Sequence, residues 1–254
     1  MANGVGKKVF FLNPHSVIQD ELVYEIVKNE YEAYLVFDHT KLVQMLREST
    51  EAIVFINVDA DSMTEPEWER YVKNIMQDNS LDIKIGILTY NSDPDLSRKY
   101  LMDLGVPCGF VVLKLGIEQS RKIILKTLKA NEAKGQRKYV RAVCVPNTAT
   151  FNVKYGNSLI KGSINDISSV GMSCFFDSTH EIKKGTLFKE VQLILKGKIV
   201  RVDAVVMGKR NMDNGRSLYV MLFGKTIAPA DREKIHKFIY EALQHNLNAR
   251  MGLN

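Results

Sequence analysis

The sequence predicts two domains: an N-terminal α/β domain with a parallel sheet, and a C-terminal six-stranded antiparallel β-barrel that ends in a helix. In the first half, apolar strand segments alternate with helical segments, which is typical of a parallel sheet covered on both faces. In the second half, short segments of period two are separated by turn residues, which is typical of a small closed barrel. The boundary is expected near residue 130, giving domains 1–130 and 131–254.

The net charge changes sign between the two halves of the chain. Residues 1–120 contain 11 Lys and Arg against 19 Asp and Glu, a net charge of −8. Residues 121–254 contain 24 Lys and Arg against 10 Asp and Glu, a net charge of +14. We therefore expect the two domains to have different partners, and the basic domain to favour an anionic one.

The first half contains five strand segments and five helical segments in alternation. The strand segments are nearly continuous apolar runs, which indicates burial on both faces of a sheet. We expect strands at residues 8–12, 34–37, 52–58, 83–89 and 110–115. We expect helices at residues 17–27, 42–46, 66–76, 96–104 and 117–128, with Ser16 as a candidate N-cap of the first.

The second half contains six strand segments and a final helix. The strands are expected at residues 151–155, 159–164, 172–176, 191–195, 198–207 and 218–223. Turns are expected at Gly156-Asn157, Lys196-Gly197 and Asp213-Asn214-Gly215. Pro229 opens the helix, whose apolar residues recur at helical spacing and should pack on the barrel or on a partner.

Composition and motif searches exclude several classes of protein. The chain has no run of about 18 apolar residues, so no membrane span is expected, and without a secretory signal we expect the cytoplasm. The five histidines are scattered, and Cys108, Cys144 and Cys174 match neither a disulfide framework nor a zinc pattern. We therefore expect no metal and no cofactor. The sequence has no nucleophile–base constellation and no Walker loop, so an enzyme is not expected.

Two short motifs at the start of the predicted barrel carry the chemistry. Arg137 and Arg141 stand four residues apart, and Asp166-Ile-Ser168-Ser-Val-Gly171 follows between two strands. Guanidinium forks bind phosphate oxygens and the acceptor atoms of guanine. The carboxylate and the hydroxyl can bind a base, and glycine permits close backbone approach.

On these motifs, residues 135 to about 245 resemble the PilZ domain, the bacterial module that binds the second messenger cyclic di-GMP. The resemblance continues in Gly197-Lys-Ile-Val-Arg201, Tyr219-Val-Met-Leu-Phe223 and Asp231-Arg232. It implies that Arg137 and Arg141 wrap the ligand from the segment that precedes the barrel, at the junction of the domains. It also implies that Asp166, Ser168 and Gly171 complete the site.

One position departs from the pattern of this family. Gln136 stands directly before the first arginine, where many relatives carry another basic residue. Whether one or two ligand molecules bind is therefore left open.

The first half resembles the receiver domain of response regulators. Thr89 matches the switch threonine of receivers, and Lys114 matches their lysine, although Leu115 replaces the usual proline. The acids that bind magnesium in receivers are replaced by Asn13, Pro14 and His15, and the phosphoacceptor position holds Asn57. Asp59 and Asp61 lie just beyond it. We therefore expect a docking or dimerisation surface in place of a phosphorylation site.

These observations predict a second-messenger sensor in which cyclic di-GMP reorients two domains and thereby controls a downstream partner. That partner would bind the N-terminal domain or the C-terminal helix. A second hypothesis is a nucleic-acid-binding module that uses aromatic residues in a basic groove. Tyr139, Phe151, Tyr155 and Phe175 offer such rings, several of them at core positions. A third hypothesis is a protein-interaction domain whose ligand site is vestigial.

Overall fold

The computed structural model describes residues 6–16, 21–177, 181–213 and 215–252. The chain forms two compact units, Met1–Lys138 and Tyr139–Asn254, a division eight residues after the expected one. The later division follows from contacts of residues just after the last helix of unit 1. Ala133 is buried, and its carbonyl oxygen accepts a hydrogen bond of 2.9 Å from the backbone N–H of Lys7.

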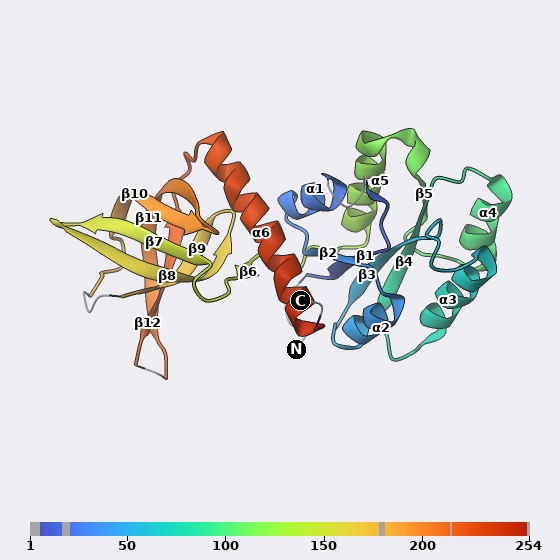
Figure 1. Cartoon of the computed structure of the whole chain (residues 1–254), viewed down its shortest axis with the longest axis horizontal. Coiled ribbons are helices and arrows are strands. Elements are labelled where there is room, and N and C mark those ends of the chain that lie inside the picture. Colours follow the sequence, from blue (N-terminus) through green and yellow to red (C-terminus); the bar gives the residue numbers. More distant parts are fainter. Residues whose placement is uncertain (1–5, 17–20, 178–180, 214, 253–254) are drawn as a thin grey trace. The chain divides into compact units, whose positions relative to one another are not determined.

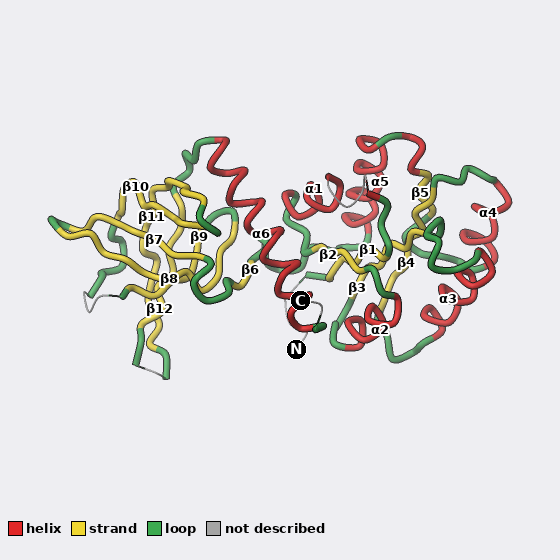
Figure 2. Tube along the Cα trace, viewed as in Figure 1, coloured by secondary structure: helices red, strands yellow, loops and turns green. Residues whose placement is uncertain are grey.

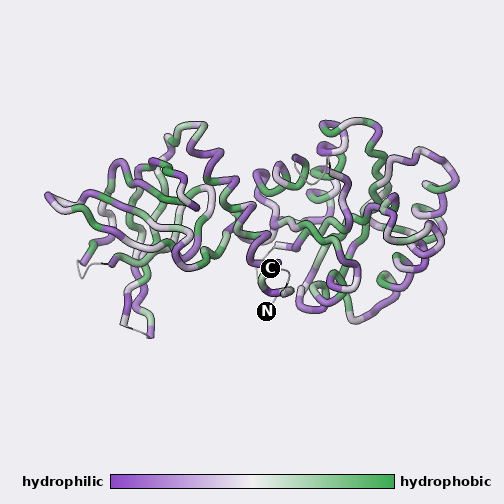
Figure 3. Tube along the Cα trace, in the orientation of Figure 1, coloured by the Kyte–Doolittle hydropathy of each residue, from purple (hydrophilic) through white to green (hydrophobic). Residues whose placement is uncertain are grey.

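Unit 1 is built on a five-stranded parallel sheet with the strand order β2-β1-β3-β4-β5. The strands are β1 (Lys8–Leu12), β2 (Ala33–Val36), β3 (Ala52–Asn57), β4 (Ile83–Thr89) and β5 (Phe110–Val112). This order belongs to the flavodoxin-like class of doubly wound folds, which includes receivers. The prediction of a receiver-like α/β domain is confirmed. Apolar residues are concentrated along these strands (Figure 3), and all six residues of β3 are buried.

Helices cover both faces of this sheet. They are α1 (Val23–Lys28), α2 (His39–Arg47), α3 (Glu65–Gln77), α4 (Pro94–Arg98), the π-helical turn η2 (Lys99–Asp103) and α5 (Ile117–Ala130). Figure 1 shows α1 and α5 on one side of the sheet and α2 and α3 on the other. The predicted start of the first helix at Val17 lies outside the described residues.

The fifth strand is shorter than predicted. It ends at Val112, and Leu113–Leu115 form a 3₁₀ turn (η3) closed by a 3.1 Å hydrogen bond from the Gly116 N–H to the Leu113 carbonyl. Gly116 has φ of 87°, which favours glycine, and it is the N-cap of α5. A short apolar run does not distinguish a strand from such a turn, which explains the error.

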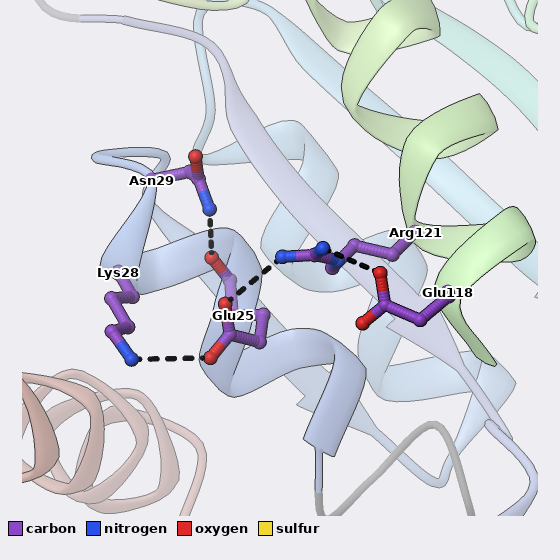
Figure 4. A network of polar contacts seen from close by, with 5 residues as sticks. All are labelled: Glu25, Lys28, Asn29, Glu118 and Arg121. Atoms are coloured by element: carbon purple, nitrogen blue, oxygen red, sulfur yellow. Dashed lines mark hydrogen bonds and ion pairs between the residues drawn. The ribbon is translucent and has the colours of Figure 1, made fainter.

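An ion-pair network joins α1 to α5 (Figure 4). Glu25 of α1 lies 3.4 Å from Arg121 of α5, and Arg121 also pairs with Glu118 at 2.6 Å. Within α1, Lys28 lies 3.3 Å from Glu25, and the Asn29 amide donates to the Glu25 carbonyl oxygen at 2.8 Å. The network holds together two helices that are almost 100 residues apart in the sequence, as the Glu25–Arg121 separation of 96 shows.

Unit 2 is a closed antiparallel barrel of six strands, as predicted. The strands are β7 (Ala149–Tyr155), β8 (Ser158–Ser168), β9 (Gly171–Phe176), β10 (Leu187–Leu195), β11 (Lys198–Asn211) and β12 (Ser217–Phe223). Each pairs with its neighbour in the order β8-β7-β10-β11-β12-β9, and the β8–β9 pairing closes the ring. A two-residue strand that the sequence did not predict, β6 (Ala142–Val143), extends the sheet beside the far end of β8.

Two of the predicted turns join strands of the barrel. Gly156-Asn157 links β7 to β8, and Lys196-Gly197 links β10 to β11. Lys196 and Gly197 have φ of 46° and 79°, the left-handed conformation of a two-residue hairpin turn. Asn214 of the third predicted turn lies outside the described residues.

Aromatic rings fill the barrel, and a helix packs on it. The Phe176 ring lies 5.1 Å from Phe151 and 5.0 Å from Tyr219 between ring centroids, both edge to face. Helix α6 (Pro229–Arg250) contacts β6, β8 and β11. Figure 2 shows α6 with the strands of this unit. None of the described helices combines the length and the apolar character needed to cross a membrane.

Replacing Asp38 by Ala should weaken unit 1 by about 0.5–2 kcal/mol, because Asp38 is the N-cap of α2. Its carboxylate accepts hydrogen bonds from the hydroxyl and the backbone N–H of Thr40 and from the N–H of Lys41. These bonds, led by the one from the Thr40 hydroxyl, lower the pKa of Asp38. Urea unfolding followed by the fluorescence of Trp68, the one tryptophan of the chain, measures the effect.

The pH dependence of this effect has a defined sign. Because the native pKa is lowered, the stabilisation by Asp38 is complete above the unfolded pKa of about 3.9. It is lost as the pH falls through the native pKa, so wild type and variant should converge in acid. The exposed Asp61 provides the matched control, since its replacement by Ala should change stability by less than about 0.5 kcal/mol. An equal loss in both variants would contradict the capping role.

Candidate ligand-binding site

The structure brings Arg141 and Asp166 together on unit 2. Asp166 belongs to β8, and Arg141 directly precedes β6, which pairs beside the end of β8. Nη1 of Arg141 lies 3.7 Å from Oδ1 of Asp166, and the side chains are 50% and 20% exposed, respectively. The pair is long and half in solvent, so the guanidinium keeps N–H donors for an anion.

The Asp166 carboxylate is held from one side by two neighbours. Its Oδ2 accepts hydrogen bonds from the Ser173 hydroxyl and, at 3.2 Å, from the Asn165 amide. The Asn165 amide also lies 3.1 Å from the Ser173 hydroxyl oxygen. These two residues were not predicted to take part in the site. In the sequence, Asn165 and Ser173 are only two polar residues on neighbouring strands, and nothing in the pattern connects them to Asp166.

Ser168 and Gly171 lie at the turn from β8 to β9. The prediction that the whole Asp-x-Ser-x-x-Gly segment lies between two strands is wrong, because Asp166 to Ser168 belong to β8, and Ser168 pairs with Gly171 at the start of β9. The Ser168 hydroxyl is buried and donates to the Gly171 carbonyl oxygen at 3.1 Å. A Cβ atom on Gly171 would lie 2.4 Å from the carbonyl oxygen of Met221. Close contact between β9 and β12 therefore requires glycine here.

A small pocket of about 30 Å³ opens among these residues. Arg141, Asp166 and Ser168 contribute its polar wall, and Val220 and Leu222 of β12 contribute an apolar wall. Both apolar side chains are partly exposed, at 38% and 42%. The volume holds about two water molecules, so a larger ligand would lie across the mouth of the pocket.

Arg137 is the one predicted site residue outside unit 2. It is exposed and is the penultimate residue of unit 1. The geometry of the candidate site is therefore that of Arg141, Asp166, Ser168 and Gly171.

Polar groups at the carboxyl edge of the unit 1 sheet bind one another. Asn57 is 4% exposed, and its amide donates to the Asn13 carbonyl oxygen at 2.8 Å. The Asp59 carboxylate accepts hydrogen bonds from the Thr89 hydroxyl, at 2.5 Å, and from the backbone N–H of Tyr90. Thr89, which the sequence resemblance matches to the switch threonine of receivers, therefore donates its hydroxyl to an acid of the chain itself.

The described cysteines and acids offer neither a reactive thiolate nor a metal site. The three cysteines are buried, and burial, with a smaller contribution from the charge of Asp166, raises the pKa of Cys144 to about 12. It therefore remains a thiol at neutral pH. Within the described ranges, no group of three or more His, Cys, Asp and Glu is placed to hold a metal ion.

The aromatic residues considered for nucleic-acid binding differ in how far their rings are exposed. Phe151 is fully buried, so its proposed use as a stacking platform is wrong. Phe175 is partly exposed, but the Arg216 guanidinium lies over its ring at 4.3 Å. The barrel core thus buries Phe151, and the Arg216 side chain covers the ring of Phe175.

Comparison with known families identifies unit 2. The model of the PilZ domain matches residues 135–241, a range that includes both arginines and the β8–β9 turn. Residues 135–241 are a PilZ domain. The match starts two residues before Arg137 and ends within α6.

Solved structures resemble parts of this chain at low identity. The PilZ domain with c-di-GMP of YcgR from Escherichia coli is 14% identical, with a TM-score of 0.39, over 46% of this chain and 98% of that one. The MrkH–c-di-GMP complex of K. pneumonia is 18% identical, with a TM-score of 0.39, over 46% and 55%. The Vibrio cholerae chemotaxis protein CheY4 is 18% identical, with a TM-score of 0.40, over 50% and 98%.

This chain spans about half the length of the longer relatives, with 50% of the YcgR chain in its c-di-GMP complex covered. No curated protein matches the sequence.

Replacing Gly171 by Ala should destabilise the PilZ domain by about 1–3 kcal/mol, because the new methyl group meets the Met221 backbone. The measurement is urea unfolding followed by far-UV circular dichroism, with Trp68 fluorescence reporting unit 1 separately. The unit 1 transition should stay unchanged.

Gly208 is the matched control, since a Cβ there meets no atom within 4 Å and its φ is not positive. Gly208→Ala should change stability by less than about 0.5 kcal/mol. A Gly171→Ala protein as stable as this control would show that the close contact is not needed.

Proposed function

We propose that this chain is a non-enzymatic receptor for cyclic di-GMP, and that the ligand binds at Arg137, Arg141, Asp166, Ser168 and Gly171. The observation that carries the proposal is the match of residues 135–241 to the PilZ domain, with Arg141 and Asp166 side by side at the mouth of a pocket. The solved PilZ domain of YcgR is named as holding c-di-GMP.

The chemistry of the site suits this ligand. Cyclic di-GMP is a ring of two phosphates and two guanosines, and arginine binds both phosphate oxygens and guanine acceptors. Arg141 is half exposed and bound loosely enough to turn toward a phosphate. The pocket admits only a small group, and the apolar wall of Val220 and Leu222 offers a face on which a base can lie.

The position of the two arginines suggests how ligand binding could change the arrangement of the two units. Arg137 belongs to unit 1 and Arg141 to unit 2, four residues apart. A ligand held by both arginines would fix the connection between the units and change the preferred arrangement of the domains. A downstream partner that distinguishes these arrangements would then be coupled to ligand binding.

Isothermal titration calorimetry of the full chain tests the proposal. We expect saturable binding of cyclic di-GMP, no comparable binding of cyclic di-AMP, and a stoichiometry that answers the question raised by Gln136. Small-angle X-ray scattering with and without ligand should show a change in the radius of gyration. Binding of neither dinucleotide, or steeply salt-dependent binding of an oligonucleotide that cyclic di-GMP does not displace, would reject the receptor.

The Arg141→Ala variant should bind cyclic di-GMP roughly 10- to 150-fold more weakly. The substitution removes a charge-assisted hydrogen bond, worth about 1.5–3 kcal/mol, and leaves the exposed position otherwise free of strain.

Lys189→Ala is its control, because Lys189 is an exposed cation of β10 that does not line the pocket. This variant should keep wild-type affinity and so correct for the general loss of positive charge. Arg141→Ala with unchanged affinity would remove Arg141 from the site.

A further inference from the structure

A β-bulge decides which way Asp166 faces. Ile164 pairs with Cys174, and Asp166 pairs with the very next residue, Ser173, so Asn165 is an extra residue in β8. Ile164 and Ile167 are both buried although they lie three positions apart, whereas a regular strand buries every second residue. The bulge therefore turns Asp166 to the outer face of the barrel, beside the pocket.

The same bulge gives the two oxygens of Asp166 different surroundings. Oδ2 takes both donors, the Ser173 hydroxyl and the Asn165 amide. Oδ1 faces the Arg141 guanidinium at 3.7 Å. A carboxylate oxygen accepts about two hydrogen bonds, so Oδ2 is saturated and the free acceptor capacity of Asp166 lies on Oδ1.

We propose that Ser173 is a positioning residue of the ligand site, which together with Asn165 fixes the Asp166 carboxylate so that Oδ1 alone meets the ligand. This inference rests on the proposed function. Ser173 is only 4% exposed and does not line the pocket, so it acts through Asp166. Without the Ser173 hydroxyl, the Asp166 carboxylate is free to rotate and to offer both oxygens to Arg141. Neither the carboxylate nor the guanidinium is then available to the ligand.

The fixed position of Oδ1 of Asp166 also affects the choice between guanine and adenine. The pairing edge of guanine carries two neighbouring N–H donors, whereas that of adenine places an acceptor nitrogen beside its amino group. A single fixed carboxylate oxygen therefore attracts the guanine edge and repels the adenine acceptor. A site whose fixed acceptor pairs with an N–H donor of the ligand disfavours analogues that lack this donor, because the acceptor then faces another acceptor.

The test measures the affinity of Ser173→Ala for cyclic di-GMP and for cyclic di-AMP by titration calorimetry. We expect the affinity for cyclic di-GMP to fall about tenfold or more, the loss of a hydrogen bond to a charged group, and the preference over cyclic di-AMP to narrow. Ser173→Thr keeps the hydroxyl and should restore both. Ser163→Ala, on the same strand as Asp166 and opposite Phe175, should behave as wild type.

The outcomes separate this inference from the proposed function. If wild type does not bind cyclic di-GMP, both fall together. If wild type binds and Ser173→Ala keeps wild-type affinity and preference, only the role of Ser173 is rejected. Should Ser173→Ala fail to fold, Asn165→Ala removes the other donor to Oδ2 and must show a loss in the same direction; unchanged binding there also overturns the proposal.

Discussion

The register shift between Ile164 and Asp166 is the constraint on which the candidate site depends. Ile164 and Ile167 both lie in the barrel core. An unbroken alternation from Ile164 would bury Asp166 and expose Ile167. The extra residue, Asn165, resolves this conflict and then takes part in holding the carboxylate it exposes. The bulge at Asn165 thus keeps both isoleucines in the core and places Asp166 at the candidate site.

The sequence predicted the architecture well because periodicity reports burial directly. The order of elements followed from continuous apolar runs in one half and from alternation in the other. Strand β4 has the predicted bounds of 83–89, since the apolar run is preceded by Asp82 and followed by Tyr90-Asn91. Such patterns cannot reveal a bulge or a two-residue strand. Hence β6 and the extension of β8 to Ser168 were missed.

The candidate site was predictable only in part, for a related reason. The resemblance supplied Arg141 and Asp166, and the structure places them together. Ser173 and Asn165 act through hydrogen bonds across the β8–β9 pair, which depend on the register of the two strands. In unit 1, the bond between Thr89 and Asp59 likewise required knowledge of which loops meet at the sheet edge.

The short strand β6 connects the arginine segment to the C-terminal helix. It begins directly after Arg141, contacts α6, and the amide of Asn246 donates to the Val143 carbonyl oxygen at 2.8 Å. A ligand that orders Arg141 would therefore also order the strand against which the end of the helix is tied. If a protein that binds this end of α6 is coupled to a ligand at the proposed site, thermodynamic reciprocity requires that each changes the affinity for the other by the same factor. The C-terminal end of α6 would then be a second place on unit 2 from which the affinity of the proposed site can be changed.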